Sequence, residues 1–209
     1  EQAKQQCGPD GAMDLPVYIS PISVAFNLPG IESLNLDAPT IAKIFKGEIK
    51  RWNAEQIKQQ NPDADLPDTP ITVVHRSDDS GTTENFTDYL HKAAPQEWTK
   101  DPAQAWPSEY AAENNKGTSG VVSTTSGTEG AVTYADSSAV GDLGTAAIKV
   151  GDQYVTHSPE AAAKAVEVSA QAEGRGEHDL AIDIERDTKE SGAYPLVLIS
   201  TTSCAPSTT

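Results

Sequence analysis

Apolar residues along this chain follow two periods, one typical of strands and one typical of helices, which predicts an α/β domain. Apolar runs, β-branched in most cases, predict buried strands at 71–74, 131–134 and 194–200. An extended segment that Pro21 interrupts is predicted at 17–28. Gly151 and Asp152 predict a hairpin turn within 143–155. Apolar positions at helical spacing predict helices at 35–45, 52–60, 82–94 and 158–172.

The segments between these elements are polar and should lie on the surface. Asp37 is predicted to cap the helix 35–45, and Gly47 to end it. Residues 98–107 should be irregular, with Trp98 and Trp106 packing over the edge of the core. The charged stretch 173–187, which holds Arg186, is predicted as a surface excursion.

The most informative chemistry follows the strand 71–74, in residues 76–82, which we call the anion turn. A helix that starts at Ser80, Gly81 and Thr82 presents unpaired N–H groups and hydroxyls that suit an oxyanion. Arg76 adds a planar guanidinium that matches two oxygens, and Asp78 stands where it can orient that group. A simpler reading fits equally well, in which Ser80 only caps a helix and Arg76 pairs with an aspartate in solvent.

Charge and length limit the class of protein. The 209 residues can form one large domain, and 31 acidic against 15 basic residues give a net charge of -16. This balance argues against nucleic acid or an anionic membrane surface as a partner. An anion would have to be held by local donors, which is feasible because exposed charges beyond roughly 10 Å are largely screened. No apolar run is long enough to span a bilayer, and residues 1–11 do not form a signal peptide.

Signals for catalysis are sparse. The four histidines lie on different predicted elements, and none is placed beside a serine or cysteine in a nucleophile pattern. His75 is predicted to point outward from the strand end and to take no part in chemistry. The two cysteines lack zinc-ligand spacing. We therefore expect no enzyme, no metal and no cofactor, although a phosphatase-like hydrolase that uses the same anion turn stays an alternative.

The string HRSDDSGTTENFTDYL resembles the phosphate-binding signature of the extracytoplasmic phosphate-binding proteins that serve the phosphate-specific (Pst) ABC importer, especially the actinobacterial ones. The strings LPVYISPISVAFNLPG and GTSGVVSTTSGTEGAVTYAD resemble that family too, and they occur in the family's order. The resemblance implies phosphate contacts from Arg76, Ser80, Gly81 and Thr82, with Asp78 fixing the guanidinium. Further candidates for lining the cleft are Gly117, Thr118 and Ser119.

The same resemblance implies a fold and a role. The family has two lobes with phosphate between them, and no stretch before Asp14 resembles the phosphate loop or the proton-accepting aspartate of the first lobe. We therefore expect a single lobe of a type II periplasmic-binding-protein fold, with a mixed sheet flanked by helices, over residues 17–200. Segments 17–28 and 194–200 should be hinge strands, between a flexible start (1–16) and a polar tail (201–209), and within them 17–24 and 196–200 should run side by side.

Partners and location follow from the family as well. The resemblance implies inorganic phosphate, the membrane permease of a phosphate ABC importer and the missing first lobe as partners, and no nucleic acid. It implies an extracytoplasmic protein, at the cell surface or in the periplasm, and is compatible with a lipid anchor on a longer precursor. An isolated lobe without ligand binding is the remaining alternative.

The extracytoplasmic location also favours a disulfide between Cys7 and Cys204. Such a bond would close nearly the whole chain, for which the chain-entropy account gives about 4 to 5 kcal/mol. Two free thiols, or partners outside this chain, are the alternatives.

Overall fold

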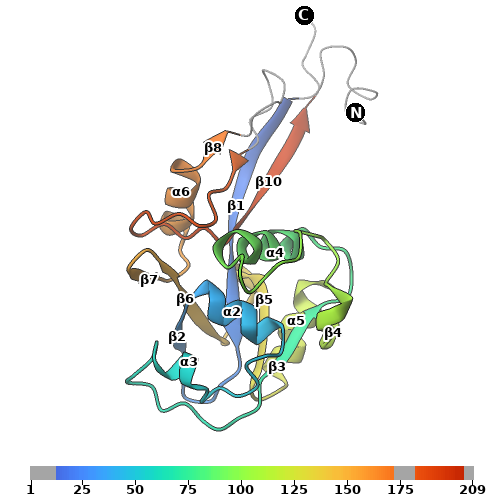
Figure 1. The fold of residues 1–209 in the computed structure, drawn as a ribbon. Coiled ribbons are helices and arrows are strands. Elements are labelled where there is room, and N and C mark those ends of the chain that lie inside the picture. The colour runs from blue at the N-terminus through green and yellow to red at the C-terminus, as the bar shows by residue number, and fades with distance from the viewer. Residues whose placement is uncertain (1–12, 172–181, 205–209) are drawn as a thin grey trace, which may run out of the picture.

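The computed structural model describes residues 13–171 and 182–204. Within them, a mixed sheet of eight strands has the order β2-β6-β1-β5-β3-β4, with β10 added beside β1 and β7 beside β6 (Figure 1). A separate two-stranded pair joins β8 to β9. The strands are β1 (Met13–Phe26), β2 (Ser33–Leu36), β3 (Thr72–Arg76), β4 (Glu113–Asn115), β5 (Ala131–Asp136), β6 (Gly144–Val150), β7 (Gln153–Val155), β8 (Ala170–Gln171), β9 (Ile182–Asp183) and β10 (Val197–Cys204).

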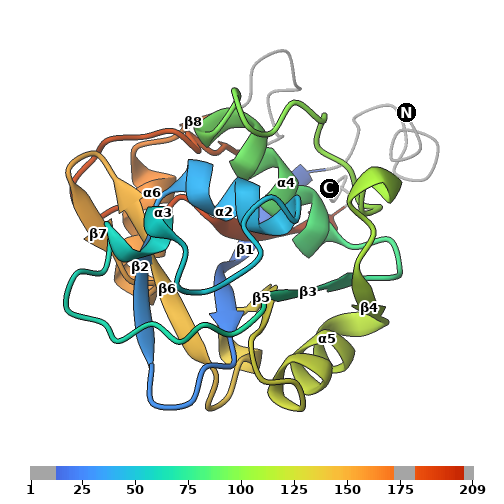
Figure 2. The ribbon, with the colours of Figure 1, turned by 60° about the horizontal axis from the view of Figure 1, so that its bottom comes forward.

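Helices cover both faces of the sheet, as expected for an α/β lobe. Helices α2 and α4 lie on one side of β3 and β5, and α5 lies on the other (Figure 2). The helices are α2 (Ala38–Phe45), α3 (Glu55–Lys58), α4 (Gly81–Ala93), α5 (Gly117–Ser126) and α6 (Pro159–Glu167), with short 3-10 turns η1 (Ser108–Tyr110) and η2 (Ser137–Ala139). The predicted fold class is confirmed.

The main core lies between the sheet and the layer formed by α2 and α4. Alternate residues of β1, among them Val24 and Phe26, face this core, whereas Ala25 between them belongs to a small cluster with Val122 of α5. Phe45 of α2 packs edge-on against Phe86 of α4, with ring centroids 4.7 Å apart. The period of two along β1 thus assigns each face of the sheet to one helical layer.

Local signals fix α2 as the sequence predicts. The Asp37 carboxylate accepts a hydrogen bond from the Thr40 N–H at 2.9 Å and caps the helix. Gly47, directly after the C-cap Lys46, has a φ of 73°, a backbone conformation in which glycine is free of strain. Both predictions are confirmed.

The extended segment around Pro21 pairs with the C-terminal strand. Tyr18 lies opposite Ser200 and Pro21 opposite Val197, so the expected side-by-side run of these two segments is confirmed. Pro21 does not interrupt β1: it is the last residue that pairs with β10, and the next residue, Ile22, already pairs with β5. On the N-terminal side of Pro21, β1 pairs with β10 alone, and the two strands leave the body of the sheet as a two-stranded ribbon (Figure 1).

Two predicted helices are shorter than their sequence pattern suggests. The helix at 52–60 is confined to α3, because the Trp52 N–H donates to the Thr69 carbonyl and its indole N–H to the Gly130 carbonyl, which holds this residue in the core outside the helix. The helix at 158–172 ends at Glu167, and β8 follows. Contacts with distant segments override the helical spacing at the start of the first helix and at the end of the second.

Two burial predictions are wrong. Trp98 does not cover the core edge but lies wholly inside the core, whereas Trp106 is half-buried against it as expected. Arg186 is only 4% exposed, so the stretch 182–187 is not a simple surface excursion, because buried acceptors surround this guanidinium.

Several predictions fall outside the described residues. Cys7, the start 1–12, residues 173–181 and the tail 205–209 belong to these, so the Cys7–Cys204 pairing and the ends of the lobe stay predictions.

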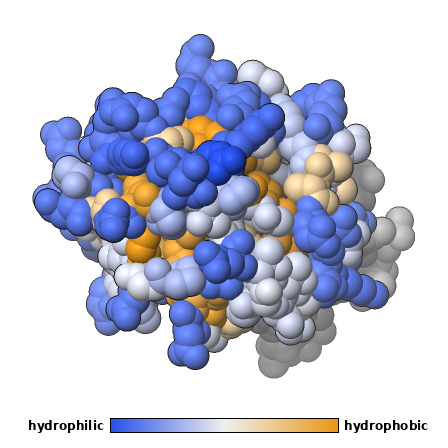
Figure 3. All heavy atoms as spheres, turned by 90° about the horizontal axis from the view of Figure 1, so that it is seen from below, coloured by the Kyte–Doolittle hydropathy of each residue, from blue (hydrophilic) through white to orange (hydrophobic). Residues whose placement is uncertain are grey.

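Seen from below, the surface is mostly hydrophilic, and apolar side chains show in hollows between charged ones (Figure 3). None of the helices that the structure describes is long and apolar enough to cross a membrane.

Candidate functional site

The anion turn connects β3 to α4, as the sequence predicts. Strand β3 is anchored by Val73 and Val74, which are buried. The chain then turns at Ser80, whose Oγ accepts hydrogen bonds from the N–H groups of Thr82 (3.1 Å) and Thr83 (3.4 Å). Ser80 therefore is the N-cap of α4, and Gly81 is exposed at its first position.

Arg76 and Asp78 form a two-point ion pair within this turn. Arg76 Nε donates to Asp78 Oδ1 at 2.7 Å, and Nη2 donates to Oδ2 at 2.6 Å. The Arg76 side chain is 12% exposed and that of Asp78 27%. The hydrogen bonds from Arg76 hold the pKa of Asp78 well below its usual range, and the same pair raises the pKa of Arg76. The guanidinium is thus fixed in one plane and permanently charged.

The start of α5 meets the same pair. The Gly117 N–H donates to Asp78 Oδ1 at 3.1 Å, and Arg76 Nη1 lies 3.5 Å from Thr118 Oγ1. Gly117 has a φ of 74°, which brings the chain into the helix through the left-handed region that glycine tolerates. Ser119 is exposed and, in the part of the chain that the structure describes, makes no hydrogen bond with the pair.

A shallow depression of about 270 Å³ lies beside the guanidinium. Ser80, Gly81 and Thr82 are not among its lining residues, and within 13–171 and 182–204 no hydrogen bond joins them to Arg76. The structure therefore brings Arg76, Asp78, Gly117 and Thr118 into contact and places the start of α4 a few residues further along the same turn. The lining residues are His75, Arg76, Ser77, Asp78, Asp79, Ala105, Trp106 and Asn114.

Tyr134 of β5 supports the anion turn from below and was not predicted as part of the site. Its Oη accepts from the Arg76 backbone N–H at 3.3 Å and lies 2.7 Å from Thr83 Oγ1. Because the oxygen already accepts from Arg76, its proton is available to Thr83. Burial raises the pKa of Tyr134 to about 12, so this hydroxyl keeps its proton at neutral pH. The string GAVTY predicts a strand here, but no signal in the sequence connects its tyrosine with the anion turn.

His75 does not point outward, contrary to the prediction. It is 7% exposed, its ring stacks on Trp106 with centroids 5.1 Å apart, and its Nε2 accepts from the Ala112 N–H at 3.3 Å. Nδ1 therefore carries the proton and donates to the Arg76 carbonyl at 2.8 Å. The alternation along β3 fails to expose His75 because β4 and the segment before it cover the end of that strand.

We expect His75 to make folding pH-dependent. Burial lowers its pKa, so the unfolded chain binds a proton more readily than the folded one. The free energy of unfolding should therefore be greatest above about pH 6.5, the usual histidine pKa, and should fall as the pH drops toward 5. Replacing His75 by Gln should reduce this slope by at most that of one proton, about 1.4 kcal/mol per pH unit. Urea unfolding at pH 7 and pH 5 measures both slopes.

His91→Gln is the matched control, since His91 lies at the C-terminal end of α4, away from the anion turn. Burial also lowers the pKa of His157, so part of the slope should survive in His75→Gln. An unchanged slope in His75→Gln would contradict the prediction.

The fold and this turn define the class of protein: an α/β domain with a mixed sheet and an arginine at a strand-to-helix turn. A family model described as "PBP superfamily domain" matches residues 1–204, and the chain belongs to this superfamily. Among the described residues, no three His, Cys, Asp or Glu side chains gather in a way that would hold a metal ion.

Curated relatives give the nearer similarities. The chain is 40% identical over 207 residues to phosphate-binding protein PstS2 of Mycobacterium bovis BCG, covering 95% of this chain and 54% of that protein. It is 38% identical over 202 residues to phosphate-binding protein PstS 3 of Mycobacterium leprae, covering 94% and 54%. The chain thus spans about half the length of the curated relatives it matches.

Solved structures agree on the fold. A high-affinity periplasmic phosphate-binding protein, PfluDING, solved with phosphate bound, superposes with a TM-score of 0.70 at 21% identity, covering 96% of this chain and 59% of that one. A phosphate-binding protein from Stenotrophomonas maltophilia gives a TM-score of 0.65 at 19% identity, covering 93% and 55%. At these identities the likeness concerns the fold alone.

Proposed function

We propose that this chain binds inorganic phosphate through the anion turn, as part of the substrate-binding component of a phosphate ABC importer. The two-point pair of Arg76 and Asp78 carries the proposal, because it presents a fixed cation in the turn that leads into α4 and against the first residues of α5. The relatives that are phosphate-binding proteins by name support it.

Unused donors in the turn match the residues that the sequence singles out. Asp78 accepts hydrogen bonds from Arg76 Nε and Nη2. Among the described residues, Arg76 Nη1 makes only the long contact with Thr118, so its N–H groups remain available to an anion. Among residues 13–171 and 182–204, Ser80 Oγ only accepts hydrogen bonds, which leaves its proton available to a ligand. Within the described part of the chain, the Gly81 N–H and the Thr82 hydroxyl have no hydrogen-bond partner. Phosphate oxygens are the acceptors that such donors fit.

We also propose that β1 and β10 are hinge strands that lead to the other lobe of the same protein. Two observations support this: the chain spans about half of its relatives, and the ribbon of β1 and β10 carries Tyr18, which is 56% exposed. The proposed context is extracytoplasmic, with the permease of the importer as the membrane partner.

No observation favours a hydrolase. His75 directly precedes the anion turn, and both of its ring nitrogens are engaged by backbone groups, so it is not free to act as a base. We therefore propose a binding protein and not an enzyme.

Titration of the ¹⁵N-labelled chain with inorganic phosphate tests the proposal. Backbone signals of Gly81 and Thr82 and the Nε signal of Arg76 should shift with a common dissociation constant. A chromogenic phosphate ester in the same buffer should not be hydrolysed. Shifts that avoid the anion turn would refute the proposal.

Replacing Asp78 by Asn should weaken phosphate binding about tenfold, because the guanidinium loses one of its two fixed bonds and turns away from the anion. Asp78 stays ionised through the neutral range, since its pKa lies well below the usual value. Asp79→Asn is the control: Asp79 is exposed in the same turn and makes no contact with Arg76 within the described residues. Calorimetry measures the phosphate affinity of both variants. Equal effects of the two changes would show that the loss of one negative charge, and not the orientation of Arg76, alters phosphate binding.

A further inference from the structure

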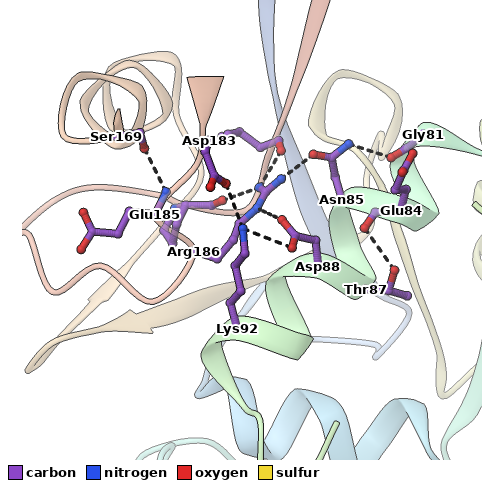
Figure 4. A network of polar contacts seen from close by, with 12 residues as sticks. Gly81, Glu84, Asn85, Thr87, Asp88, Lys92, Ser169, Asp183, Glu185 and Arg186 are labelled. Atoms are coloured by element: carbon purple, nitrogen blue, oxygen red, sulfur yellow. Dashed lines mark hydrogen bonds and ion pairs between the residues drawn. The ribbon is translucent and has the colours of Figure 1, made fainter. Parts of the chain in front are cut away.

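A buried arginine joins the first residues of β10 to helix α4 (Figure 4). Arg186 Nη1 donates to the carbonyls of Pro195 and Val197, each at 2.7 Å. Its Nε donates to Asp88 Oδ2 at 2.9 Å, and its Nη2 donates to Asn85 Oδ1. Every arm of the guanidinium is thus occupied, two by α4 and one by the main chain at the start of β10.

The network continues to the anion turn. Asn85 Nδ2 donates to the Gly81 carbonyl at 2.9 Å, and Gly81 is the first residue of α4. The start of β10 also lies close to this residue, since a Cβ built on Gly81 would stand 3.6 Å from Leu198 Cδ1. The hydrogen bonds therefore connect two places that also lie close together in space.

The arrangement is stiff. The Arg186 side chain is 3% exposed, so its hydrogen bonds form away from water, and the planar fork allows little change in the angle between its partners. Asp88 also pairs with Lys92 at 3.4 Å, and Lys92 with Asp183 at 3.0 Å, which closes the outer side of the cluster. A shift of β10 along its axis must break these bonds or carry the first turn of α4 with it.

We propose that Arg186 is a positioning residue that couples the path of β10 to the anion turn, with Asn85 as the link. Arg186 itself does not contact the anion. The inference rests on the proposed function, because it assigns β10 to the hinge and the anion turn to phosphate. A change in the hinge then alters the position of the Gly81 donor, and bound phosphate in turn restrains β10.

Asn85→Ala tests the link without removing the buried cation. Asn85 is half-buried beside a depression of about 470 Å³ that Arg186 also lines, so truncation leaves no closed cavity. Alanine is also a better helix former than asparagine, which offsets part of the cost of leaving Arg186 Nη2 without this acceptor. We expect phosphate to bind about fivefold more weakly, the lower range of known coupling between sites.

The decisive measurement is a phosphate titration followed by ¹⁵N NMR. In the unaltered chain, phosphate should shift the amide signals of 197–199 together with that of Gly81. In Asn85→Ala the shifts at 197–199 should be lost, while those at the anion turn remain. Arg186→Lys should act in the same direction, because an ammonium cannot hold both carbonyls and Asn85 in the same geometry. Arg51→Lys, at an exposed pair with Asp68, is the matched control.

Two failures are distinguishable. If phosphate causes no shifts at the anion turn of the unaltered chain, the proposed function fails and the coupling fails with it. If phosphate binds there but Asn85→Ala keeps the same affinity within twofold and still shows shifts at 197–199, the coupling alone is overturned.

Discussion

Replacing Arg76 by Met should abolish measurable phosphate binding by this chain. Arg76 supplies the charged donor of the anion turn, whereas Ser80, Gly81 and Thr82 supply neutral ones. Its loss removes charge-assisted bonds of about 1.5 to 3 kcal/mol each, which for two bonds corresponds to at least a hundredfold in affinity. The change also leaves the carboxylate of Asp78 without its partner, close to the incoming anion. Calorimetric or NMR titration with phosphate at neutral pH measures the loss.

The fold should survive this change. Asp78 is 27% exposed and keeps the Gly117 N–H, so water can solvate the unpaired carboxylate. Arg51→Met, which removes an exposed arginine, controls for the change in net charge. Binding by Arg76→Met within fivefold of the unaltered chain, at an unchanged melting temperature, would show that the anion is held elsewhere.

The anion turn was predictable because its signals are local. A β-branched run, a serine at the cap and apolar residues at helical spacing lie within one stretch of 71–94, and each acts on its own neighbours. The same holds for the cap at Asp37 and the hairpin turn at Gly151, whose φ is 58°. Where strand, turn and helix signals agree, the sequence alone leads to the correct element.

The errors concern residues whose surroundings come from distant parts of the chain. Trp98 and His75 are covered by segments whose position cannot be predicted from the residues next to them. The acceptors around Arg186 lie about ten and about a hundred positions away in the sequence. Composition marked 173–187 as charged and therefore exposed, yet four hydrogen bonds offset the desolvation of one guanidinium. Such burial depends on tertiary pairing, which a single sequence does not reveal.

The candidate site shows the same difference between contacts of residues close in sequence, which were predictable, and contacts between distant segments, which were not. The pair of Arg76 with Asp78 follows from a spacing of two residues, and the resemblance pointed to Gly117 and Thr118 as neighbours. Tyr134 reaches the anion turn from β5 through parallel pairing with β3, a contact between segments about sixty residues apart. Sequence reasoning placed this tyrosine in a strand but had no means of finding its role.

Inorganic phosphate should bind this chain only in the millimolar range. The depression at Arg76 is shallow and open to water, so the donors act in a high dielectric rather than around a buried anion. A net charge of -16 adds no long-range attraction. Binding near 1 mM corresponds to about -4.1 kcal/mol, which is the order of magnitude that two or three solvated charge-assisted bonds of about 1.5 to 3 kcal/mol each can supply. Titration by NMR is suited to this range.

Sulfate should compete with phosphate within about threefold at this site, because most of the binding comes from donors that both anions accept equally. Hydrogen phosphate differs from sulfate by carrying a proton, so discrimination needs an acceptor aimed at it. Asp78, the best placed carboxylate, already accepts three hydrogen bonds, two from Arg76 and one from Gly117, and a pKa well below its usual range makes it a poor acceptor for that proton. Competition with sulfate at constant ionic strength and neutral pH decides the matter. Tenfold preference for phosphate would require an acceptor in this chain, and Asp79, exposed in the same turn, is the first residue to replace in that case.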